Sequence, residues 1–412
     1  MNEGKMKIIL IQNTPYLPTK GGSDKSNKLL LESLAILGHE CFIIAPATSL
    51  QTPGGFERFS TLVNEKNPDF VNANDDRIAF GINGVTIHAL KKFSRLPEHL
   101  GRVFAEEKPD WIFVPSDDFA QVLLEQAVKL DALKVIYLAR TTLTLPFGPD
   151  AYLELPKKAE LVKKARGIMC VSRFISDYIY KWSGARSSVL PISLYGNGSF
   201  PDYGSFENGY VTMINPCAYK GISILLALAE RFSAVRFLAV SSWGTSSEDI
   251  AAMKQRDNIT VMDAVEDVEL VYKKTKILLV PSLWAEAKAR CIGEAMLRGI
   301  PVMASDVGGN GEAKCGTDYL LPVNQITKYE YRLDQRKLPV AAVPVQDVYP
   351  WRQALERLLI DREHYMNLSK ASRSSAYDTL IKDNGVERVE AFLHGLMENV
   401  AGRASAAAKK EI

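Results

Sequence analysis

The segment ILLVPSLWAEAKARCIGEAMLRGIPVMAS, residues 277–305, decides the fold because it reads as a strand, a helix and a second strand. Residues 277–280 form a short, fully apolar run, which is typical of a buried parallel strand. Residues 289–298 read as a helix, and Gly299 suits the left-handed position after a helix end. Residues 300–305 then predict the next strand. Because ligands in open parallel sheets bind beyond the carboxyl ends of strands, a ligand site is expected just after residue 280.

Two glutamates of this segment, Glu286 and Glu294, have seven residues between them. Glu286 comes directly after the first strand, and Glu294 lies further along the helix. Carboxylates accept hydrogen bonds from neighbouring sugar hydroxyls, and the helix N-terminus near Ala289 can hold a phosphate through its N–H groups and dipole. The segment therefore predicts a nucleotide-sugar site, in which Glu286 contacts only a substrate. Glutamates also keep a helix surface soluble, and their spacing alone does not separate the two interpretations.

Length and composition favour an ordinary two-domain globular protein. The chain has 412 residues, of which 47% are hydrophobic and 24% charged. This length exceeds one hydrophobic core, so two domains of roughly 150 to 200 residues are expected. The formal net charge of +2 favours no nucleic-acid partner. Because no run approaches about 18 apolar residues and the N-terminus lacks a signal-peptide core, the sequence predicts a cytoplasmic protein.

Neither the cysteines nor the histidines indicate a metal site. The five cysteines are scattered and never form a C-x-x-C pair, which favours buried, reduced thiols. The five histidines are equally dispersed and lack metal-ligand spacing. We therefore expect no bound metal.

Strands and helices alternate along the chain in two blocks. In the first block, strands are expected at 7–13, 41–45, 111–114, 135–138 and 168–171, with helices between them, the first of which is expected at 26–37. Gly21 and Gly22 fall in the first loop, where they allow either close backbone approach to a phosphate or acceptor, or a simple tight turn. The dinucleotide pattern G-x-G-x-x-G is absent. This alternation predicts a parallel sheet covered on both faces.

A second alternating block follows a segment at 190–209 that is rich in Gly, Pro, Ser and Asn and reads as a linker. Its strands are expected at 211–215, 235–240, 259–261, 277–280 and 301–305, with a helix at 222–232. The sequence thus predicts two Rossmann-like, doubly wound α/β domains, 1–200 and 201–379, facing each other across a cleft. A helix at about 380–400 is expected to pack back on the first domain, before a flexible tail at 401–412.

Two motifs of the second domain resemble those of the retaining glycosyltransferases of family four, which have the GT-B fold. One is the glutamate pair, followed by a glycine-rich stretch that includes Gly308 and Gly309; the other is NPCAYKG, residues 215–221. The likeness spans nearly the whole chain. It implies that Glu286 contacts the donor sugar, that Glu294 holds the ribose, and that Lys220 neutralises the donor diphosphate.

Three positions depart from the family pattern. The family has an arginine where this chain has Asn215, so the resemblance leaves Lys220 without its usual second cation. Arg290 is the substitute that we predict, although an ordinary solvated helix arginine explains it equally well. Ala289 replaces a glycine whose N–H approaches the diphosphate; it keeps the N–H but adds a methyl group. Gly293 is unusual inside a helix. It predicts close packing by the nucleoside, or equally by another helix.

The resemblance also places an acceptor side in the first domain. Arg140 occupies the position where many family members have a histidine, and since arginine stays protonated it cannot act as a general base. It is expected to contact the diphosphate or an anionic acceptor, near Thr141. Asp117 and Asp118 follow the strand at 111–114 and can position an acceptor hydroxyl, although helix capping is the more ordinary role for such residues.

The resemblance implies a retaining glycosyltransferase, of hexosyltransferase type, that uses a nucleotide diphosphate sugar, an acceptor hydroxyl and no metal. The nucleotide sugar would be a substrate, so no cofactor is implied. The acceptor, whether a small molecule, a glycan or a lipid-linked sugar, and the oligomeric state are not readable from the sequence. Two alternatives stay open: a degenerate nucleotide-sugar-binding or partner-dependent protein, and a nucleotide-sugar 2-epimerase of the same fold.

A basic segment at 156–166 raises the question of membrane contact. It places five cations near apolar residues, as in helices that dock on anionic lipid. An ordinary solvated helix explains the same pattern, so peripheral membrane contact stays one of two interpretations.

Overall fold

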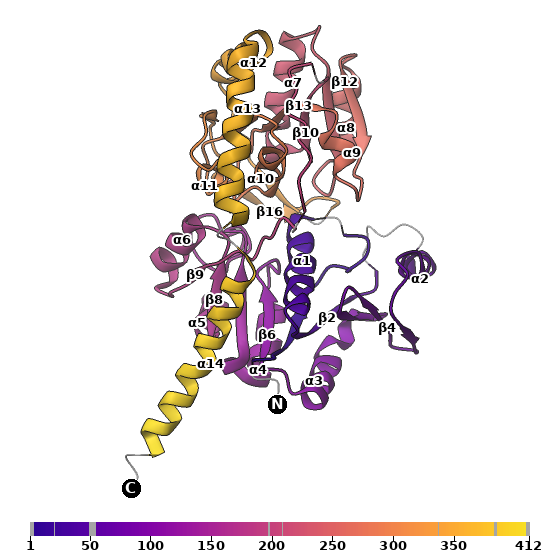
Figure 1. Cartoon of the computed structure of the whole chain (residues 1–412), viewed down its shortest axis with the longest axis vertical. Helices are drawn as coiled ribbons and strands as arrows, with labels where there is room; N and C mark the ends of the chain where they lie inside the picture. The colour runs from indigo at the N-terminus through magenta and orange to yellow at the C-terminus, as the bar shows by residue number, and fades with distance from the viewer. Residues whose placement is uncertain are drawn as a thin grey trace. The chain divides into compact units, whose positions relative to one another are not determined.

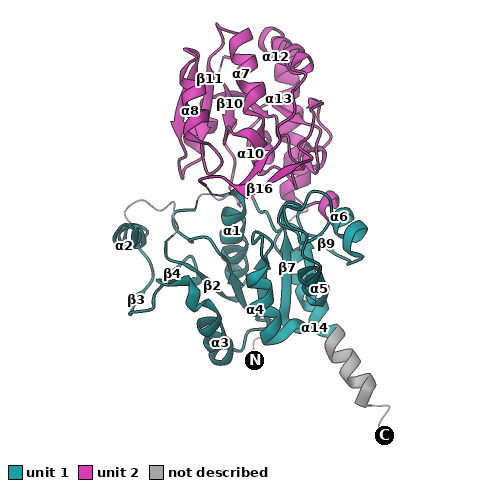
Figure 2. Ribbon diagram, turned by 180° about the vertical axis from the view of Figure 1, so that it is seen from behind, with its two compact units in different colours: residues 1–171, 176–194, 384–412 teal, residues 172–175, 195–383 magenta. Residues whose placement is uncertain are grey.

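In the computed structural model the chain divides into two compact units (Figure 2). Unit 1 comprises Met1–Val171, Ser176–Leu194 and Asn384–Ile412, and unit 2 comprises Ser172–Ile175 and Tyr195–Asp383. The structure describes residues 4–19, 21–48, 55–196, 198–207, 209–336, 338–382 and 385–408. Residues 197 and 208 of the expected linker, and 409–412 of the expected tail, lie outside the described residues.

Unit 1 contains a nine-stranded sheet with helices around it (Figure 1). Its strands are β1 Lys7–Ile11, β2 Glu40–Pro46, β3 Val71–Ala73, β4 Arg77–Ile82, β5 Val85–Leu90, β6 Trp111–Pro115, β7 Val135–Ala139, β8 Gly167–Cys170 and β9 Ser188–Val189. Its helices are α1 Gly22–Ile36, α2 Gly55–Glu65, α3 Leu96–Glu107, α4 Val122–Asp131, α5 Pro156–Lys164, most of α6 Arg173–Ser183, and α14 Glu387–Ala408.

The strand order of unit 1 is β3-β4-β5-β2-β1-β6-β7-β8-β9, in which the pairs from β5 through β9 are parallel. The expectation of a wholly parallel sheet is wrong at one edge, because β3, β4 and β5 pair antiparallel. Asn83 and Gly84 connect β4 to β5 with positive φ angles of 52° and 76°. An Asn-Gly pair of this kind favours a tight hairpin, so the sequence did carry this signal.

Unit 2 has the strand order β12-β11-β10-β13-β14-β15, all parallel, which is that of a Rossmann domain. Its strands are β10 Tyr210–Ile214, β11 Phe237–Ser241, β12 Ile259–Asp263, β13 Thr275–Val280, β14 Val302–Ser305 and β15 Leu320–Leu321, with a separate hairpin of β16 Tyr329–Leu333 and β17 Pro339–Ala341. Its helices are α7 Ile222–Arg231, α8 Ser247–Lys254, α9 Glu269–Tyr272, α10 Arg290–Leu297, α11 Asn310–Ala313, α12 Tyr349–Ile360 and α13 Arg362–Tyr377.

The deciding segment folds as expected. Residues 277–280 belong to β13 and are buried, α10 ends before Gly299, and Gly299 has a φ of 70°. The left-handed conformation explains the glycine, because a side chain there would be strained. The turn places β14 beside β13, where Leu278 pairs with Val302.

No helix among the described residues is long and apolar enough to cross a membrane. Three cations of the basic segment contact protein atoms: Lys158 pairs with Glu125, Lys163 pairs with Glu160, and Arg166 donates to the carbonyl of Leu396 at 2.7 Å. These contacts account for much of the charge pattern in and after α5. Peripheral membrane contact stays a prediction.

Candidate functional site

In unit 2 the strand order reverses between β10 and β13, which are neighbours in the sheet and lead to α7 and α10. This place is the topological switch point of the unit. Ligands in doubly wound sheets bind at this point, beyond the carboxyl ends of the two strands. Lys220 follows β10, and Glu286 follows β13. The two residues predicted to act on the donor therefore meet where the fold favours a ligand.

Lys220 and Glu286 form an ion pair in which Nζ contacts Oε1. The Glu286 carboxylate also accepts a 2.6 Å hydrogen bond from the Ser282 hydroxyl, and the residue is only 6% exposed. Burial alone would raise the pKa of Glu286 and lower that of Lys220. The mutual attraction and hydrogen bonds outweigh burial, so the pKa of Glu286 is lowered and that of Lys220 is raised. The expectation that Glu286 contacts only a substrate is therefore wrong.

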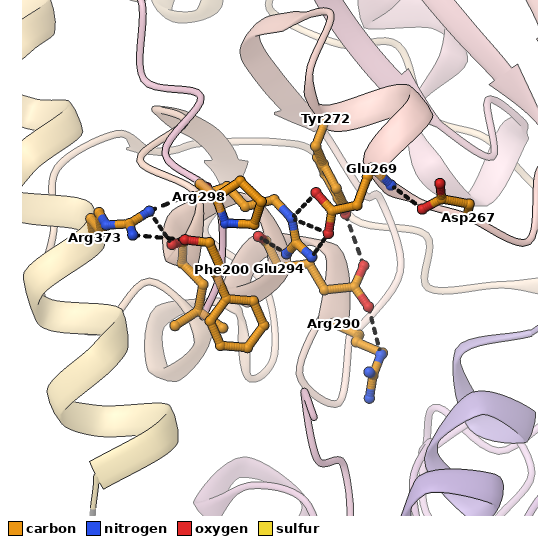
Figure 3. A network of polar contacts seen from close by, with 10 residues as sticks. Phe200, Asp267, Glu269, Tyr272, Arg290, Glu294, Arg298 and Arg373 are labelled. Atoms are coloured by element: carbon orange, nitrogen blue, oxygen red, sulfur yellow. Dashed lines mark hydrogen bonds and ion pairs between the residues drawn. The ribbon is translucent and has the colours of Figure 1, made fainter. Parts of the chain in front are cut away.

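Glu294 lies within α10, and its carboxylate accepts hydrogen bonds from two side chains (Figure 3). The Tyr272 hydroxyl donates to its Oε2 at 2.8 Å, and Arg290 Nε donates to its Oε1 at 2.7 Å. The Arg290 guanidinium also lies over the ring of Tyr195, 5.1 Å from its centroid. These contacts orient the carboxylate that the sequence assigns to the ribose, and they give Arg290 a structural task beside it.

The remaining predicted donor residues have distinct local roles. Ala289 is the N-cap residue of α10, where its side chain makes no capping hydrogen bond. Gly293 is explained by packing: a β-carbon there would lie 2.6 Å from the Tyr195 hydroxyl oxygen and 2.7 Å from Leu380 Cδ1. Asn215 has a left-handed φ of 60°, and its Oδ1 accepts a 2.8 Å hydrogen bond from Gly244 N. It thus joins the carboxyl ends of β10 and β11.

The Lys220 ammonium lies over an aromatic ring, 4.9 Å from the centroid of Trp284. Trp284 contacts Tyr219 and Trp243 at centroid distances of 5.4 and 6.3 Å. These aromatic residues, together with Ser282 and Tyr272, were not predicted from the sequence. Ser282 stands four residues before Glu286 and was detectable, whereas Tyr272 reaches Glu294 only through the tertiary fold.

In unit 1 the corresponding switch point lies between β1 and β6. The helix after β1 begins at Gly22 and not at about residue 26, so Gly21 and Gly22 stand at the N-terminus of α1 rather than in a free loop. The Ser23 hydroxyl in this first turn donates to Asp117 Oδ2 at 2.6 Å. Asp24 nearby has its pKa raised by burial.

Arg140 reaches the same place from the end of β7. One of its terminal nitrogens donates to Ser23 Oγ at 3.4 Å and to Asn27, and the other donates to the carbonyl of Ile192 at 3.2 Å. Ser23 thus connects Arg140 to Asp117, and the structure brings these predicted residues of unit 1 together.

The two other acceptor-side candidates serve local structure. Asp118 accepts hydrogen bonds from the N–H groups of Ala120 and Leu123 at the start of α4, which is the capping alternative. Thr141 Oγ1 accepts from Leu143 N at 3.3 Å. Among the described residues, no group of three or more His, Cys, Asp or Glu side chains is arranged to hold a metal ion.

Comparison with solved structures shows which fold the chain has. A glycosyltransferase from Rickettsia africae is 14% identical with a TM-score of 0.62, covering 96% of this chain and 99% of that chain. The Anabaena protein HepE in complex with UDP-glucose is 12% identical with a TM-score of 0.65, covering 96% and 100%. The starch synthase IV catalytic domain of Arabidopsis thaliana, bound to ADP and acarbose, is 12% identical with a TM-score of 0.60, covering 96% and 99%. The chain therefore has the GT-B fold.

Sequence comparison finds a family match within unit 2. Residues 208–334, less than half of the chain, match the family described as "Glycosyl transferases group 1". This part of the chain is therefore similar to group 1 glycosyltransferases, in agreement with the resemblance of the two motifs. A search of curated proteins finds no match to this chain.

Proposed function

We propose that this chain is a retaining glycosyltransferase that moves a sugar from a nucleotide diphosphate sugar to an acceptor hydroxyl. The observation that carries the proposal is the buried Lys220–Glu286 pair at the switch point of a group 1 glycosyltransferase domain. Removing such a charged pair from water costs free energy, so the pair contributes little to stability alone. It is well suited to a ligand that carries both hydroxyls and a diphosphate.

The roles follow from charge and position. Lys220 stabilises the diphosphate as it leaves, Glu286 orients the donor sugar, and Glu294 accepts hydrogen bonds from the ribose. The N-terminus of α10, at Ala289, offers N–H groups to a phosphate oxygen. The acceptor hydroxyl loses its proton to the departing diphosphate on the face where it attacks, so the anomeric configuration is retained. In this scheme the protein supplies positioning and electrostatic stabilisation.

In unit 1, Arg140 and Asp117 would serve the acceptor side. Arg140 keeps its charge at all relevant pH values and is therefore suited to an anionic group, not to proton transfer. Asp117, which accepts from Ser23, can hold an acceptor hydroxyl. Because Ser23 contacts both Arg140 and Asp117, it would hold the two side chains in fixed positions.

Binding of nucleotides provides the first test. The Anabaena neighbour holds UDP-glucose and the Arabidopsis neighbour holds ADP, so UDP, ADP and their sugars are the first candidates. We expect one nucleotide diphosphate to raise the melting temperature, since a ligand at 100 times its Kd stabilises the folded state by about 2.7 kcal/mol. Sugar transfer to an acceptor supports the proposal. Binding without turnover on any acceptor would indicate a degenerate binding protein, and epimerised donor would indicate a 2-epimerase.

The role of Glu286 is tested by a double-mutant cycle. Glu286→Gln should lower turnover at least about 100-fold, and it should also destabilise the protein because Lys220 is left buried without its partner. Adding Lys220→Met should recover stability but not turnover. Glu356→Gln on the exposed face of α12 is the matched control. Near-normal turnover of the Glu286 variant would contradict the donor-site assignment.

Metal independence is a separate expectation. Because protein groups, among them Lys220 and the α10 N-terminus, would balance the diphosphate charge, turnover should not change when EDTA is added. Assays with EDTA and with added Mg²⁺ measure this directly, and strong dependence on Mg²⁺ would contradict it.

A further inference from the structure

A second cation for the diphosphate is missing from its usual place, and the inference below rests on the proposed function. Asn215 stands where the family has an arginine, and the substitute predicted from the sequence, Arg290, is bonded to Glu294 and lies over Tyr195. A leaving diphosphate carries more charge than Lys220 can balance. Another cation near the carboxyl ends of β10 and β11 would supply this need.

The β16–β17 hairpin is fastened to the loop that carries Lys220. The Tyr219 hydroxyl donates to the carbonyl of Pro339 in β17, and the ring of Tyr329 in β16 stacks on Tyr219 with 6.1 Å between centroids and 22° between planes. Ahead of the hairpin, Ile326 N donates to the Leu283 carbonyl at 2.7 Å, beside Trp284. The hairpin is therefore anchored next to Lys220 and Glu286.

Arg336 lies in the turn of this hairpin and reaches the end of β11. Its NH1 donates to the carbonyl of Gly244, whose N–H donates to Asn215 Oδ1 at 2.8 Å. Its Nε donates to Asp334 Oδ2 at 2.8 Å, and NH2 donates to the same oxygen. NH1 also lies 4.0 Å from Asp249 Oδ2. A guanidinium has five N–H donors, so three hydrogen bonds leave donors for a ligand on a side chain that is 27% exposed.

The charges of Arg336 and Lys220 both act on the Cys217 thiol. Burial raises the pKa of the Cys217 thiol to about 11, and the charges of both Lys220 and Arg336 counteract that rise. Trp243, next to Gly244, contacts Trp284, over which the Lys220 ammonium lies. In addition, Asn215 is only 5% exposed, and its buried Nδ2 makes no hydrogen bond to the described residues.

We propose that Arg336, carried by the β16–β17 hairpin, supplies the second positive charge for the donor diphosphate. Through Gly244, Arg336 is connected to Asn215, the position where the family has an arginine. Asp334 holds the guanidinium plane in place before the donor arrives, as carboxylate–guanidinium pairs do. Arg336 lies just outside residues 208–334, the part of the chain that matches the family.

Calorimetric titration separates diphosphate contact from hairpin folding. UDP and ADP would be titrated into the wild type, Arg336→Met and Arg336→Lys, with UMP, AMP and the nucleosides as probes that lack the second phosphate. For the diphosphate that binds, Arg336→Met should weaken affinity about 10- to 100-fold, the effect of one or two charge-assisted hydrogen bonds. Affinity for the matching nucleoside should not change, and Arg336→Lys should recover part of the loss.

Arg332→Met is the matched control, because Arg332 lies on the same hairpin with 65% of its side chain exposed and pairs with Glu330. It should bind the diphosphate like the wild type. Equal loss of nucleoside and diphosphate affinity in Arg336→Met, an equal effect of Arg332→Met, or unchanged diphosphate affinity would each overturn the proposal for Arg336. A wild type that binds neither diphosphate would instead contradict the proposed function itself, and this inference with it.

Discussion

Two lysines of unit 2, the half-buried Lys220 and the fully buried Lys314, show how single residues divide between function and structure. Lys220 has Glu286 as a partner, so its charge is kept. Lys314 is fully buried, and its Nζ donates to the Val302 carbonyl at 2.6 Å. Burial lowers the pKa of Lys314 to about 7. One lysine is thus held ready as a cation, whereas the other loses its charge near neutral pH.

The low pKa of Lys314 predicts a stability change with pH. Its pKa is about 7 in the folded state against the ordinary 10.5, so between these values the unfolded chain binds more protons. The free energy of unfolding should therefore rise with pH from about 7 to 10.5, by at most about 1.4 kcal/mol per pH unit. Urea unfolding at pH 7, 8 and 9 measures this slope.

Lys314→Met should remove that part of the slope, and Lys370→Met, on the exposed face of α13, should leave it unchanged. An identical slope in the wild type and in Lys314→Met would contradict the assignment. The comparison between variants matters because other groups also titrate in this range.

At the scale of elements, the loop before α10 depends on a glycine pair that belongs to the next strand–helix turn. Gly309 N donates to the Glu286 carbonyl at 2.7 Å. A β-carbon on Gly308 would lie 2.2 Å from the same carbonyl oxygen, and one on Gly309 would lie 1.9 Å from the Ala287 carbonyl oxygen. The position of Glu286 thus depends on close backbone contact between two loops that are more than 20 residues apart.

Gly309→Ala should therefore displace the 286–289 loop. We expect a loss of stability of roughly 1–3 kcal/mol from this overpacking, together with weaker nucleotide binding. Gly311→Ala is the control two residues away, since its β-carbon would meet its nearest neighbour, Leu320, at 3.7 Å. Thermal unfolding with and without UDP or ADP compares the two variants. Equal behaviour of both would show that the close contact does not position the loop.

At the scale of the whole molecule, unit 1 is completed by the last helix of the chain. Helix α14 runs alongside the unit 1 sheet in Figure 1. His39 Nε2 lies 3.0 Å from Glu390 Oε1, and the Leu393 side chain is fully buried. The fold of unit 1 therefore depends on residues that follow unit 2 in the sequence.

Leu393→Ala should destabilise unit 1 by about 2–5 kcal/mol, because a fully buried leucine is replaced by a cavity. Amide hydrogen exchange should become faster in peptides of β1 and β8 and stay unchanged in β10 and β13. Met397→Ala, at a side chain that is 38% exposed, should have little effect. Faster exchange confined to unit 2 would contradict the assignment of α14 to unit 1.

Local patterns predicted much of this arrangement. Apolar runs predicted the parallel strands, and Gly299 predicted the end of α10, because both depend on neighbours in the sequence. The hairpin around Asn83 was missed, although its Asn-Gly pair is a sequence signal, and the start of α1 at Gly22 was misplaced. Gly293 was assigned to the nucleoside or to packing, and Tyr195 and Leu380 account for it by packing.

The sequence by itself determined that the chain forms two α/β units and that Glu286 and Lys220 follow strands of the second, since strand ends and loop residues are set locally. Only the tertiary structure decided that Lys220 pairs with Glu286 and that Arg336 lies beside Gly244, whereas Arg290–Glu294 and Arg336–Asp334 are pairs between near neighbours in the sequence. The physical reason is that electrostatic attraction and burial depend on distance in space. Arg336, which is 92 residues beyond Gly244 in the sequence, can therefore reach the strand end where Asn215 lies.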